Sequence, residues 1–234
     1  MKRLKNHRAR EIWMEKTLKA LPAGSSLLDV GAGECAYKPH CAHLEYLAQD
    51  IAEYDGTGDK GLHTKAWDTT PLDFVCDLYD IPEDRTFDTV MCSEVLEHVV
   101  DPVRAVEKMP RLVKPGGRLI LTAPFNSLTH FAPYHFCTGF SQFFYRHHLD
   151  RLGFEIEEIT ANGGFFDVMD QEIGRVSRTR RQYKVWFAEP ITFLVMMLAR
   201  LNVRLISKLD GDRLERTTAE LSTFGWFVIG TRAR

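Results

Sequence analysis

Short apolar runs bounded by glycine, proline or aspartate recur along the first two-thirds of the chain. Five of them read SLLDV, EYLAQD, LDFVCD, FDTVMCS and GRLILTAP, and each has the length of a strand buried inside a parallel sheet. Two more runs, GFEIEEIT and GWFVIGTRA, have the pattern of strands nearer the end of the chain.

Apolar residues at helical spacing separate several of these runs. The spacing predicts helices over about 8–20, Glu94–Val99, Pro102–Val113 and about 140–152. Strands that alternate with helices imply right-handed crossovers and an open, mostly parallel sheet. We therefore expect an α/β fold.

The length of the chain bounds its domain organisation. A chain of 234 residues is long enough for one large α/β domain with a full core. We expect an N-terminal helix over residues 1–24 and one domain over residues 25–234. Within that domain, residues 162–223 have a largely helical pattern and form an insertion before the last strand.

Composition narrows the setting in which the chain works. The net charge is only −2, and the first two-thirds carry no basic stripe interleaved with aromatics, so nucleic acid is not an expected partner. Five cysteines without C-x-x-C spacing are typical of reduced cytoplasmic thiols. The N-terminus lacks an apolar core of signal-peptide length, and the apolar run at 191–199 is short for a bilayer. We expect a cytoplasmic protein.

Candidate binding residues follow the predicted strands, where an open parallel sheet binds its ligands. Gly31 and Gly33 form a turn that allows close approach of a ligand, and Asp50 is placed to accept hydrogen bonds from ribose hydroxyls. Asp77 and Leu78 could hold an adenine ring. The glycine turn also fits the fingerprint of nicotinamide enzymes, and each carboxylate could instead be a helix N-cap, so both alternatives stay open.

Four longer motifs carry a family resemblance. LLDVGAG (27–33), CDLYDIP (76–82), FDTVMCSEVLEHVVDP (87–102) and LVKPGGRLILTAP (112–124) occur in the order typical of type 11 class I methyltransferases, which the chain resembles over about 25–164. The resemblance implies a Rossmann-like sheet of seven strands with an antiparallel last strand, and S-adenosylmethionine as cofactor. It implies cofactor-binding roles for Asp29, Gly31, Gly33, Asp50, Asp77, Leu78, Cys92 and Ser93.

Two segments depart from a simple reading. Between Asp50 and Asp77 the chain is rich in glycine, threonine and aspartate where the family has a helix, so this crossover is expected to be a loop. Glu94, Glu97 and His98 have the spacing of a metal or acid/base cluster on a helix. We favour a carboxylate at a helix start and a histidine packed against the glycine turn, and expect no metal.

The segment after the fifth strand could act on the methyl acceptor. Methyl transfer needs alignment and, for a hydroxyl, a base, and this segment holds His130, Tyr134 and His135. We predict these as catalytic, with the alternative that they only line the pocket. The expected acceptor is a small molecule, a sugar or glycan-biosynthesis intermediate methylated on oxygen. Alternatives are C- or O-methylation of a quinone-like or natural-product ring, and a non-catalytic S-adenosylmethionine-binding module.

The insertion combines cationic and apolar sequence. Residues 175–184 hold five cationic residues and no acidic one, and an apolar helix is expected over Ile191–Leu205. Such a sequence could dock on an anionic bilayer surface. We favour instead a lid or a dimerisation element, with the apolar helix packed on the domain or on a second copy of the chain.

Overall fold

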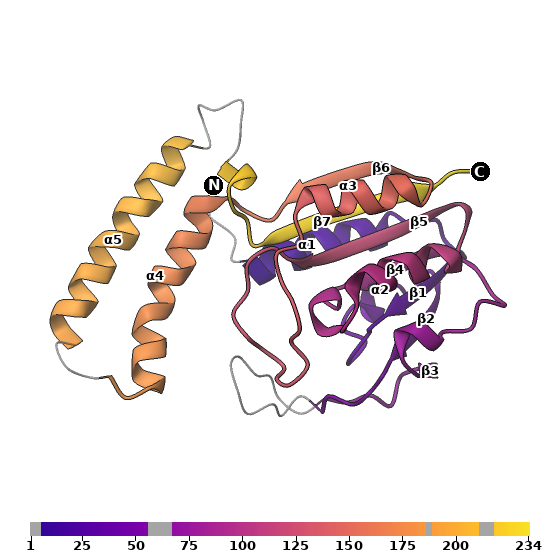
Figure 1. Cartoon of the computed structure of the whole chain (residues 1–234), viewed down its shortest axis with the longest axis horizontal. Helices are drawn as coiled ribbons and strands as arrows, with labels where there is room; N and C mark the ends of the chain where they lie inside the picture. The colour runs from indigo at the N-terminus through magenta and orange to yellow at the C-terminus, as the bar shows by residue number, and fades with distance from the viewer. Residues whose placement is uncertain (1–5, 56–66, 186–188, 211–217) are drawn as a thin grey trace. The chain divides into compact units, whose positions relative to one another are not determined.

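The computed structural model describes residues 6–55, 67–185, 189–210 and 218–234. The chain forms two compact units, the first made of Met1–Thr160 with Gly225–Arg234 and the second of Ala161–Phe224. The chain passes from the first unit to the second after Thr160, at the end of β6, and returns to the first unit at the start of β7 (Figure 1).

The first unit is built on a seven-stranded sheet. The strand order is β3-β2-β1-β4-β5-β7-β6, and β7 is antiparallel to β5, as the resemblance implied. The pairings of β1 with β2 and β4, of β2 with β3 and of β4 with β5 are parallel. The strands are β1 Ser26–Val30, β2 Glu45–Asp50, β3 Phe74–Val75, β4 Phe87–Ser93, β5 Val113–Pro124, β6 Phe154–Ala161 and β7 Gly225–Arg232.

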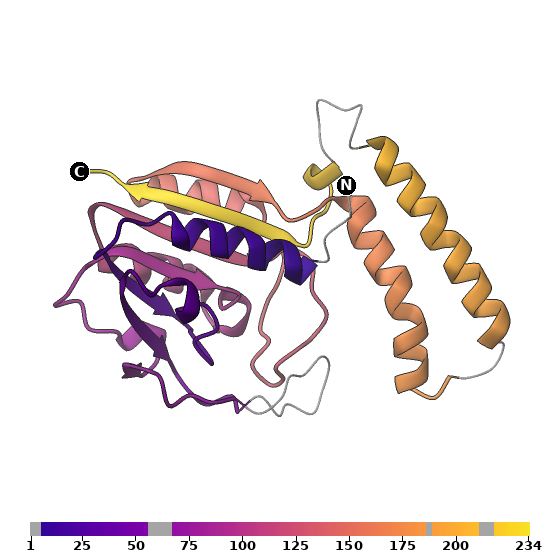
Figure 2. The same ribbon diagram turned by 180° about the vertical axis from the view of Figure 1, so that it is seen from behind.

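Helices cover both faces of this sheet. Helix α1 (Asn6–Lys19) lies on one face, and α2 (Pro102–Lys108) and α3 (Gln142–Arg151) lie on the other (Figures 1 and 2). The indole ring of Trp13 in α1 stacks on Phe227 of β7 at 4.8 Å, and its N–H donates to Glu158 of β6 at 2.8 Å. The N-terminal helix is therefore part of the core of the first unit.

Two predicted helices are shorter than the sequence suggested. Between β4 and α2 there is only a 3₁₀ turn, Leu96–His98, because Glu94 has a left-handed backbone (φ 56°) that no α-helix can contain. Helix α2 ends at Lys108, and a second 3₁₀ turn follows over Met109–Leu112. Pro110 lies in that turn and has no N–H to continue the α-helical pattern.

The second crossover contains no helix in the part that the structure describes, Ile51–Asp55 and Trp67–Asp73; residues 56–66 lie outside it. The strand predicted over 72–77 shortens to Phe74–Val75, at the edge of the sheet. Asp77 therefore does not end a strand. It caps a 3₁₀ turn over Leu78–Asp80 (η2) and accepts a hydrogen bond from the Tyr79 N–H at 3.0 Å.

A carboxylate joins the starts of β1 and β4 to the turn that begins β5. Asp88 accepts hydrogen bonds from the N–H and hydroxyl of Ser26, at 2.9 and 2.7 Å, and from the Lys114 ammonium at 2.9 Å. Partial burial opposes ionisation of Asp88, but the bonds from Lys114 and Ser26 outweigh it and lower its pKa to about 2.

The second unit contains a helical hairpin, α4 (Phe165–Gln182) and α5 (Glu189–Asp210). Asp170 of α4 accepts hydrogen bonds from Arg200 and Arg204 of α5, both at 2.9 Å from Nε. These ion pairs fix the register of one helix against the other. Gly174 gives the Arg200 guanidinium room, since a Cβ there would lie 2.9 Å from the Arg200 Cζ.

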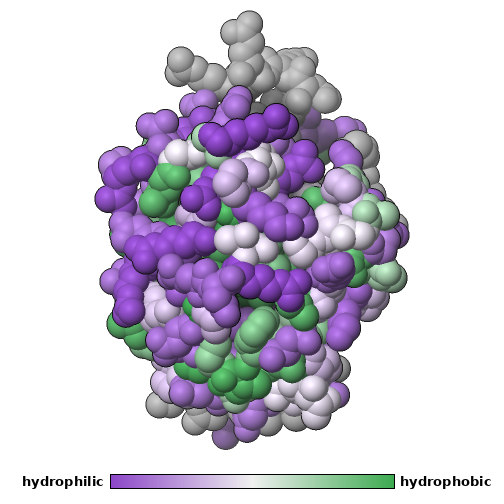
Figure 3. Space-filling view, turned by 90° about the vertical axis from the view of Figure 1, so that its right-hand side faces the viewer, coloured by the Kyte–Doolittle hydropathy of each residue, from purple (hydrophilic) through white to green (hydrophobic). Residues whose placement is uncertain are grey.

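The outer face of α5 is apolar and exposed. The first unit is mainly polar on the face seen in Figure 3, whereas α5 exposes nine large apolar side chains, Ile191, Phe193, Leu194, Val195, Met197, Leu198, Leu201, Leu205 and Ile206. By length and composition alone, Pro190–Lys208 could cross a membrane, with a mean hydropathy of 1.4. The continuous apolar run at 191–199 is shorter than the apolar face of this helix. Arg200 and Arg204 interrupt the run in the sequence, but they do not interrupt the apolar face.

Exchanging Asp88 for asparagine tests the link between β1, β4 and β5. The folded pKa, about 2, lies below the ordinary 3.8, so the stability that Asp88 contributes is present above about pH 4 and lost as pH falls through about 2. The side chain is 41% exposed, and we therefore expect Asp88→Asn to lower the free energy of unfolding at pH 7 by only about 1 kcal/mol. Urea titrations at pH 7 and pH 2 measure the difference, with Asp84→Asn on the exposed surface as control. An equal loss at both pH values contradicts the assignment.

Candidate functional site

A cavity of about 360 Å³ opens at the carboxyl ends of β1, β2 and β4. This is where an open parallel sheet binds ligands, and the volume lies in the range of small-molecule sites. Gly31, Asp50 and Glu94 follow or end the three strands and line the cavity. Its remaining wall is rich in aromatic side chains, namely Tyr54, Trp67, Tyr79, Phe131, Tyr134 and Phe136.

The glycine turn after β1 is required by the packing of two loops. Gly31 has a φ of +72°, and a Cβ there would lie 2.3 Å from a methyl carbon of Val95, which follows β4. We expected the absent side chain to leave room for a ligand, but Val95 fills that side. Gly33 also has a positive φ (+53°), and a Cβ there would come within 3.2 Å of Trp67.

Asp50 holds the loops after β1 and β2 together at the cavity. Its two carboxylate oxygens accept hydrogen bonds from the Gly33 N–H at 2.9 Å and the Ala52 N–H at 2.8 Å. A carboxylate accepts about four hydrogen bonds, so Asp50 can still accept from a bound ligand. Gln49, which the sequence did not single out, also lines the cavity and donates to the Cys76 carbonyl at 2.7 Å.

Asp77 and Leu78 also line the cavity, as predicted. The binding role and the helix-cap role of Asp77 were treated as alternatives, but both are compatible in the structure. One carboxylate oxygen, Oδ1, caps the turn η2, while the residue faces the cavity. Leu78 is 5% exposed and supplies an apolar surface beside the carboxylate.

Four predicted cofactor residues are not among the described residues that line the cavity: Gly33, whose N–H is bonded to Asp50, and three residues of the strands. Asp29 is buried inside β1 and accepts a hydrogen bond from the Tyr46 hydroxyl at 2.5 Å. Its burial raises the pKa of Asp29 to about 7. Cys92 is fully buried, and the Ser93 hydroxyl is hydrogen-bonded to that of Thr122 at 2.9 Å. These side chains support the strands beneath the cavity.

Glu94 lines the cavity. From the sequence we expected it to be a carboxylate at the start of a helix. One oxygen accepts from the Thr122 hydroxyl at 3.0 Å, and the other pairs with the Arg10 guanidinium of α1 at 2.5 Å. Burial is the largest single effect on Arg10 and would lower its pKa, but attraction to Glu94, Tyr37 and Glu11 together raises it. The position of Glu94 straight after β4 was a usable signal. Nothing in the sequence of α1 indicated Arg10.

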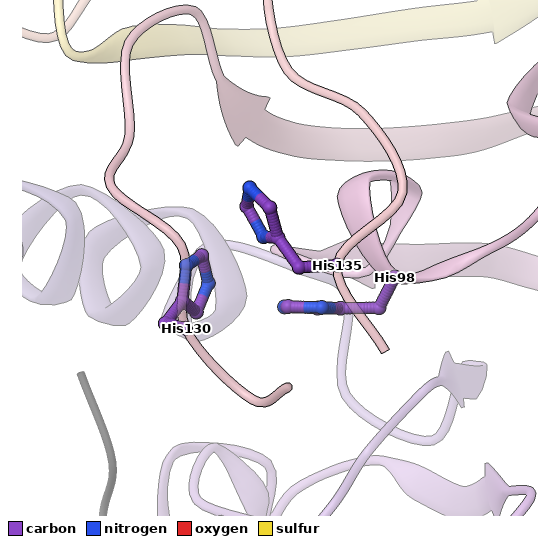
Figure 4. Close-up of side chains that lie close together, drawn as sticks. All are labelled: His98, His130 and His135. Atoms are coloured by element: carbon purple, nitrogen blue, oxygen red, sulfur yellow. The ribbon is translucent and has the colours of Figure 1, made fainter. Parts of the chain in front are cut away.

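The predicted catalytic residues divide into two groups. Tyr134 lines the cavity, whereas His130 and His135 lie beside it and face His98, which does line it (Figure 4). The ring centroids of His98 and His130 are 4.7 Å apart, and those of His130 and His135 are also 4.7 Å apart. His98 stacks on Phe131 at 5.0 Å.

Burial controls the charge of the histidine cluster. It lowers the pKa of His98 to about 4, an effect that His130 and His135 reinforce, so His98 is neutral at pH 7. The neighbouring Glu97 is fully buried, and burial together with the Glu94 carboxylate raises its pKa well above the usual range. The edge of the cavity thus holds the His98 imidazole without positive charge.

Comparisons with known proteins agree with this geometry. A family model described as a methyltransferase domain matches residues 28–121. The chain is 33% identical over 119 residues to a demethylmenaquinone methyltransferase of Clavibacter sepedonicus, covering 47% of this chain and 46% of that protein. It is 35% identical over 105 residues to a ubiquinone biosynthesis O-methyltransferase of Xanthomonas oryzae pv. oryzae, covering 43% of each.

The chain thus spans less than half the length of these curated relatives. Among solved structures, it resembles the N-methyltransferase NodS of Bradyrhizobium japonicum with a TM-score of 0.54. That match covers 98% of this chain and 97% of the other at 11% sequence identity. Such low identity concerns the fold alone.

Alanine at position 31 tests the packing of the two loops. Gly31→Ala adds a clash with Val95 to the strain of a left-handed backbone, which by itself costs roughly 1–2 kcal/mol. We expect a clear drop in the thermal unfolding midpoint and a smaller drop when the same change is made in a Val95→Ala background. Gly24→Ala is the matched control, because Gly24 has a φ of +76° and open space around it. Equal drops for Gly24→Ala and Gly31→Ala contradict the contact.

Proposed function

We propose that this chain, which carries a domain of the type 11 methyltransferase family over residues 28–121, transfers a methyl group from S-adenosylmethionine to a small-molecule acceptor. The observation that carries the proposal is the cavity at the carboxyl ends of β1, β2 and β4. It combines the glycine turn, Asp50 and Asp77 with a group of histidines at one edge.

The charge of the cavity favours this cofactor over a nicotinamide dinucleotide. Four acidic residues line the cavity, and no lysine or arginine does so among the described residues; the acids are Asp50, Glu53, Asp77 and Glu94. S-adenosylmethionine carries a sulfonium and an ammonium, which an acidic wall attracts, whereas a dinucleotide carries a pyrophosphate that it repels. Asp50 would hold the ribose, and Asp77 with Leu78 the adenine.

The chain's own residues then have to position the acceptor and deal with its proton. The cofactor supplies an activated methyl group, so alignment is the main requirement. Tyr134 and Phe131 form the cavity wall nearest to His98. His98, His130 and His135 lie at this wall as the groups that can assist loss of a hydroxyl proton.

We propose a phenolic, quinone-precursor-like ring as the acceptor, methylated on oxygen. The two relatives described above are named for menaquinone and ubiquinone biosynthesis, whereas neither of their names supports the sugar expected from sequence. The aromatic lining offers flat apolar surfaces, and Trp67 and Phe131 meet edge to face at 5.2 Å. A planar ring can stack among such side chains.

Cofactor binding and turnover test the proposal together. We expect the protein to bind S-adenosylmethionine but not reduced nicotinamide dinucleotide, and to transfer a labelled methyl group to a catechol faster than to a free hexose. Asp50→Ala should weaken cofactor binding by about 1–3 kcal/mol, roughly 5- to 150-fold, since ribose hydroxyls lose a charged acceptor. Calorimetry measures the affinity.

Asp84→Asn is the matched control, because Asp84 is exposed and does not line the cavity. Unchanged affinity in a folded Asp50→Ala protein removes Asp50 from the site. Faster transfer to the hexose restores the sugar hypothesis, and cofactor binding without transfer to any acceptor favours a binding module.

We further propose that the protein is cytoplasmic and forms a homodimer through α5. All five cysteines are free, which suits a reducing compartment. The exposed face of α5 is apolar along its length, and two copies paired by twofold symmetry would bury the same residues on each. A bilayer surface is the competing partner for this helix.

Sedimentation distinguishes the two partners. We expect a dimer that dissociates on dilution and that is lost in Leu194→Glu/Leu201→Glu, because buried carboxylates would oppose the helix pairing. Leu221→Glu is the matched control, since Leu221 is 74% exposed and lies outside α5. A monomer at all concentrations that pellets with anionic liposomes, and fails to pellet after the α5 changes, overturns the dimer.

A further inference from the structure

Three histidines from two segments meet beside the cavity. His98 belongs to the turn after β4, and His130 and His135 belong to the loop between β5 and α3 (Figure 4). One ring nitrogen from each lies within 4.8 Å of the others. The three rings therefore converge on one small volume.

Hydrogen bonds to carbonyl groups fix which nitrogens carry protons. The Nδ1 of His98 is bonded to the Tyr134 carbonyl, and the Nδ1 of His130 lies 2.9 Å from the Leu128 carbonyl. A carbonyl only accepts, so Nδ1 carries a hydrogen in each ring, and Nε2 presents a lone pair whenever the ring is neutral. Metal-binding histidines commonly have this arrangement, with the remote N–H held by a carbonyl.

A buried carboxylate lies against both lone pairs. The Oε1 of Glu97 is 3.6 Å from the His98 Nε2 and 3.8 Å from the His130 Nε2, and the Glu97 side chain is fully buried. Neither Glu97 oxygen accepts a hydrogen bond from the side chain of another described residue. The His98 Nε2 and the His135 Nδ1 are likewise buried without a hydrogen-bond partner among the described residues.

None of these four groups reaches another at hydrogen-bond distance, although the Nε2 atoms of His98 and His130 both face Glu97. A proton on Glu97 would not resolve this, because 3.6 and 3.8 Å exceed hydrogen-bond length. Arg10, the cation paired with the adjacent Glu94, is held on that residue, as is the Thr122 hydroxyl. A positive ion at the centre would satisfy all four groups at once.

We propose that His98, His130, His135 and Glu97 bind a divalent transition-metal ion of the zinc type. Three imidazoles and one carboxylate suit Zn²⁺ and similar ions, whereas Mg²⁺ prefers oxygen ligands. Zinc–ligand bonds near 2.1 Å place the ligand atoms of a tetrahedral site about 3.4 Å apart. The distances from the Glu97 Oε1 to the Nε2 atoms of His98 and His130, 3.6 and 3.8 Å, approach that spacing. The loop that carries His130 and His135 has to close slightly for the site to form.

Glu94, Glu97 and His98 have the spacing of a metal cluster, but from this one segment we expected no metal. Glu94 is engaged by Arg10 and does not belong to the proposed set. The missing ligands come from the loop after β5, more than thirty residues further along the chain.

The place of the ion gives it a role, which rests on the proposed methyltransferase function. His98 faces the cavity, so a bound ion would form part of the wall next to the acceptor. A divalent ion there would attract an acceptor hydroxyl and lower its pKa, so that the oxygen loses its proton before methyl transfer. Ion binding itself does not depend on that role.

Titration of the whole chain with metal alone tests the site. Chelator-treated protein is titrated with Zn²⁺ and, for its visible spectrum, with Co²⁺. We expect one ion per chain, cobalt bands typical of tetrahedral nitrogen and oxygen ligands, and no binding of Mg²⁺ at the same concentration. His130→Ala, His135→Ala and Glu97→Gln should each weaken zinc binding at least tenfold.

Matched controls separate the site from incidental binding. His147→Ala and His148→Ala on α3 remove histidines outside the cluster, and Cys137→Ser removes a nearby thiol; all three should bind zinc as the original protein does. Zinc should raise the unfolding midpoint of the original protein and of these controls, but not that of His130→Ala. Circular dichroism confirms that each variant is folded, and His130→Gln replaces His130→Ala if the latter is not.

Two results overturn the proposal: zinc binding that the cluster substitutions leave unchanged, and an original protein that binds no more zinc than His130→Ala. Failure of the methyltransferase function is distinguishable, because calorimetry with S-adenosylmethionine is performed separately. Zinc binding without cofactor binding would preserve the site and remove only its catalytic role.

Discussion

The contact between Gly31 and Val95 is the constraint on which the cavity depends. The loops after β1 and β4 approach so closely that a Cβ on residue 31 would lie 2.3 Å from a Val95 methyl group. Because this contact fixes the two loops, Asp50 can bond to the Gly33 N–H on one side while Glu94 and His98 line the other. The opening of the cavity is set by backbone packing before any ligand is present.

A second requirement is the balance of buried charge after β4. Glu94 and Glu97 are three residues apart on a tight turn, and both lie at or near the cavity. Arg10 from α1 compensates the first, which explains why the N-terminal helix packs on the sheet with its guanidinium largely buried. No described lysine or arginine pairs with Glu97, and the histidine cluster forms around it instead. A cation thus compensates Glu94, whereas burial and the Glu94 carboxylate raise the pKa of Glu97.

The helical hairpin of α4 and α5 separates its polar contacts from its apolar surface. Asp170 of α4 is joined to Arg200 and Arg204 on the side of α5 that faces α4. The arginines that interrupt the apolar sequence are thus used inside the hairpin, and the remaining surface of α5 is left apolar. The hairpin alone leaves this apolar face exposed, and an exposed apolar face of this kind is typical of an interaction surface.

Sequence patterns predicted the order and type of nearly all strands, and they placed Gly31, Asp50, Asp77 and Leu78 at the edge of the sheet where the cavity lies. These features depend on local rules: buried strands need continuous apolar runs, and ligand-binding side chains follow strand ends. Tertiary structure alone decided that Asp29, Cys92 and Ser93 support the strands, that Arg10 reaches Glu94, and that His98 meets His130 and His135. These are contacts between segments distant in sequence, and spacing along one segment carries no information about them.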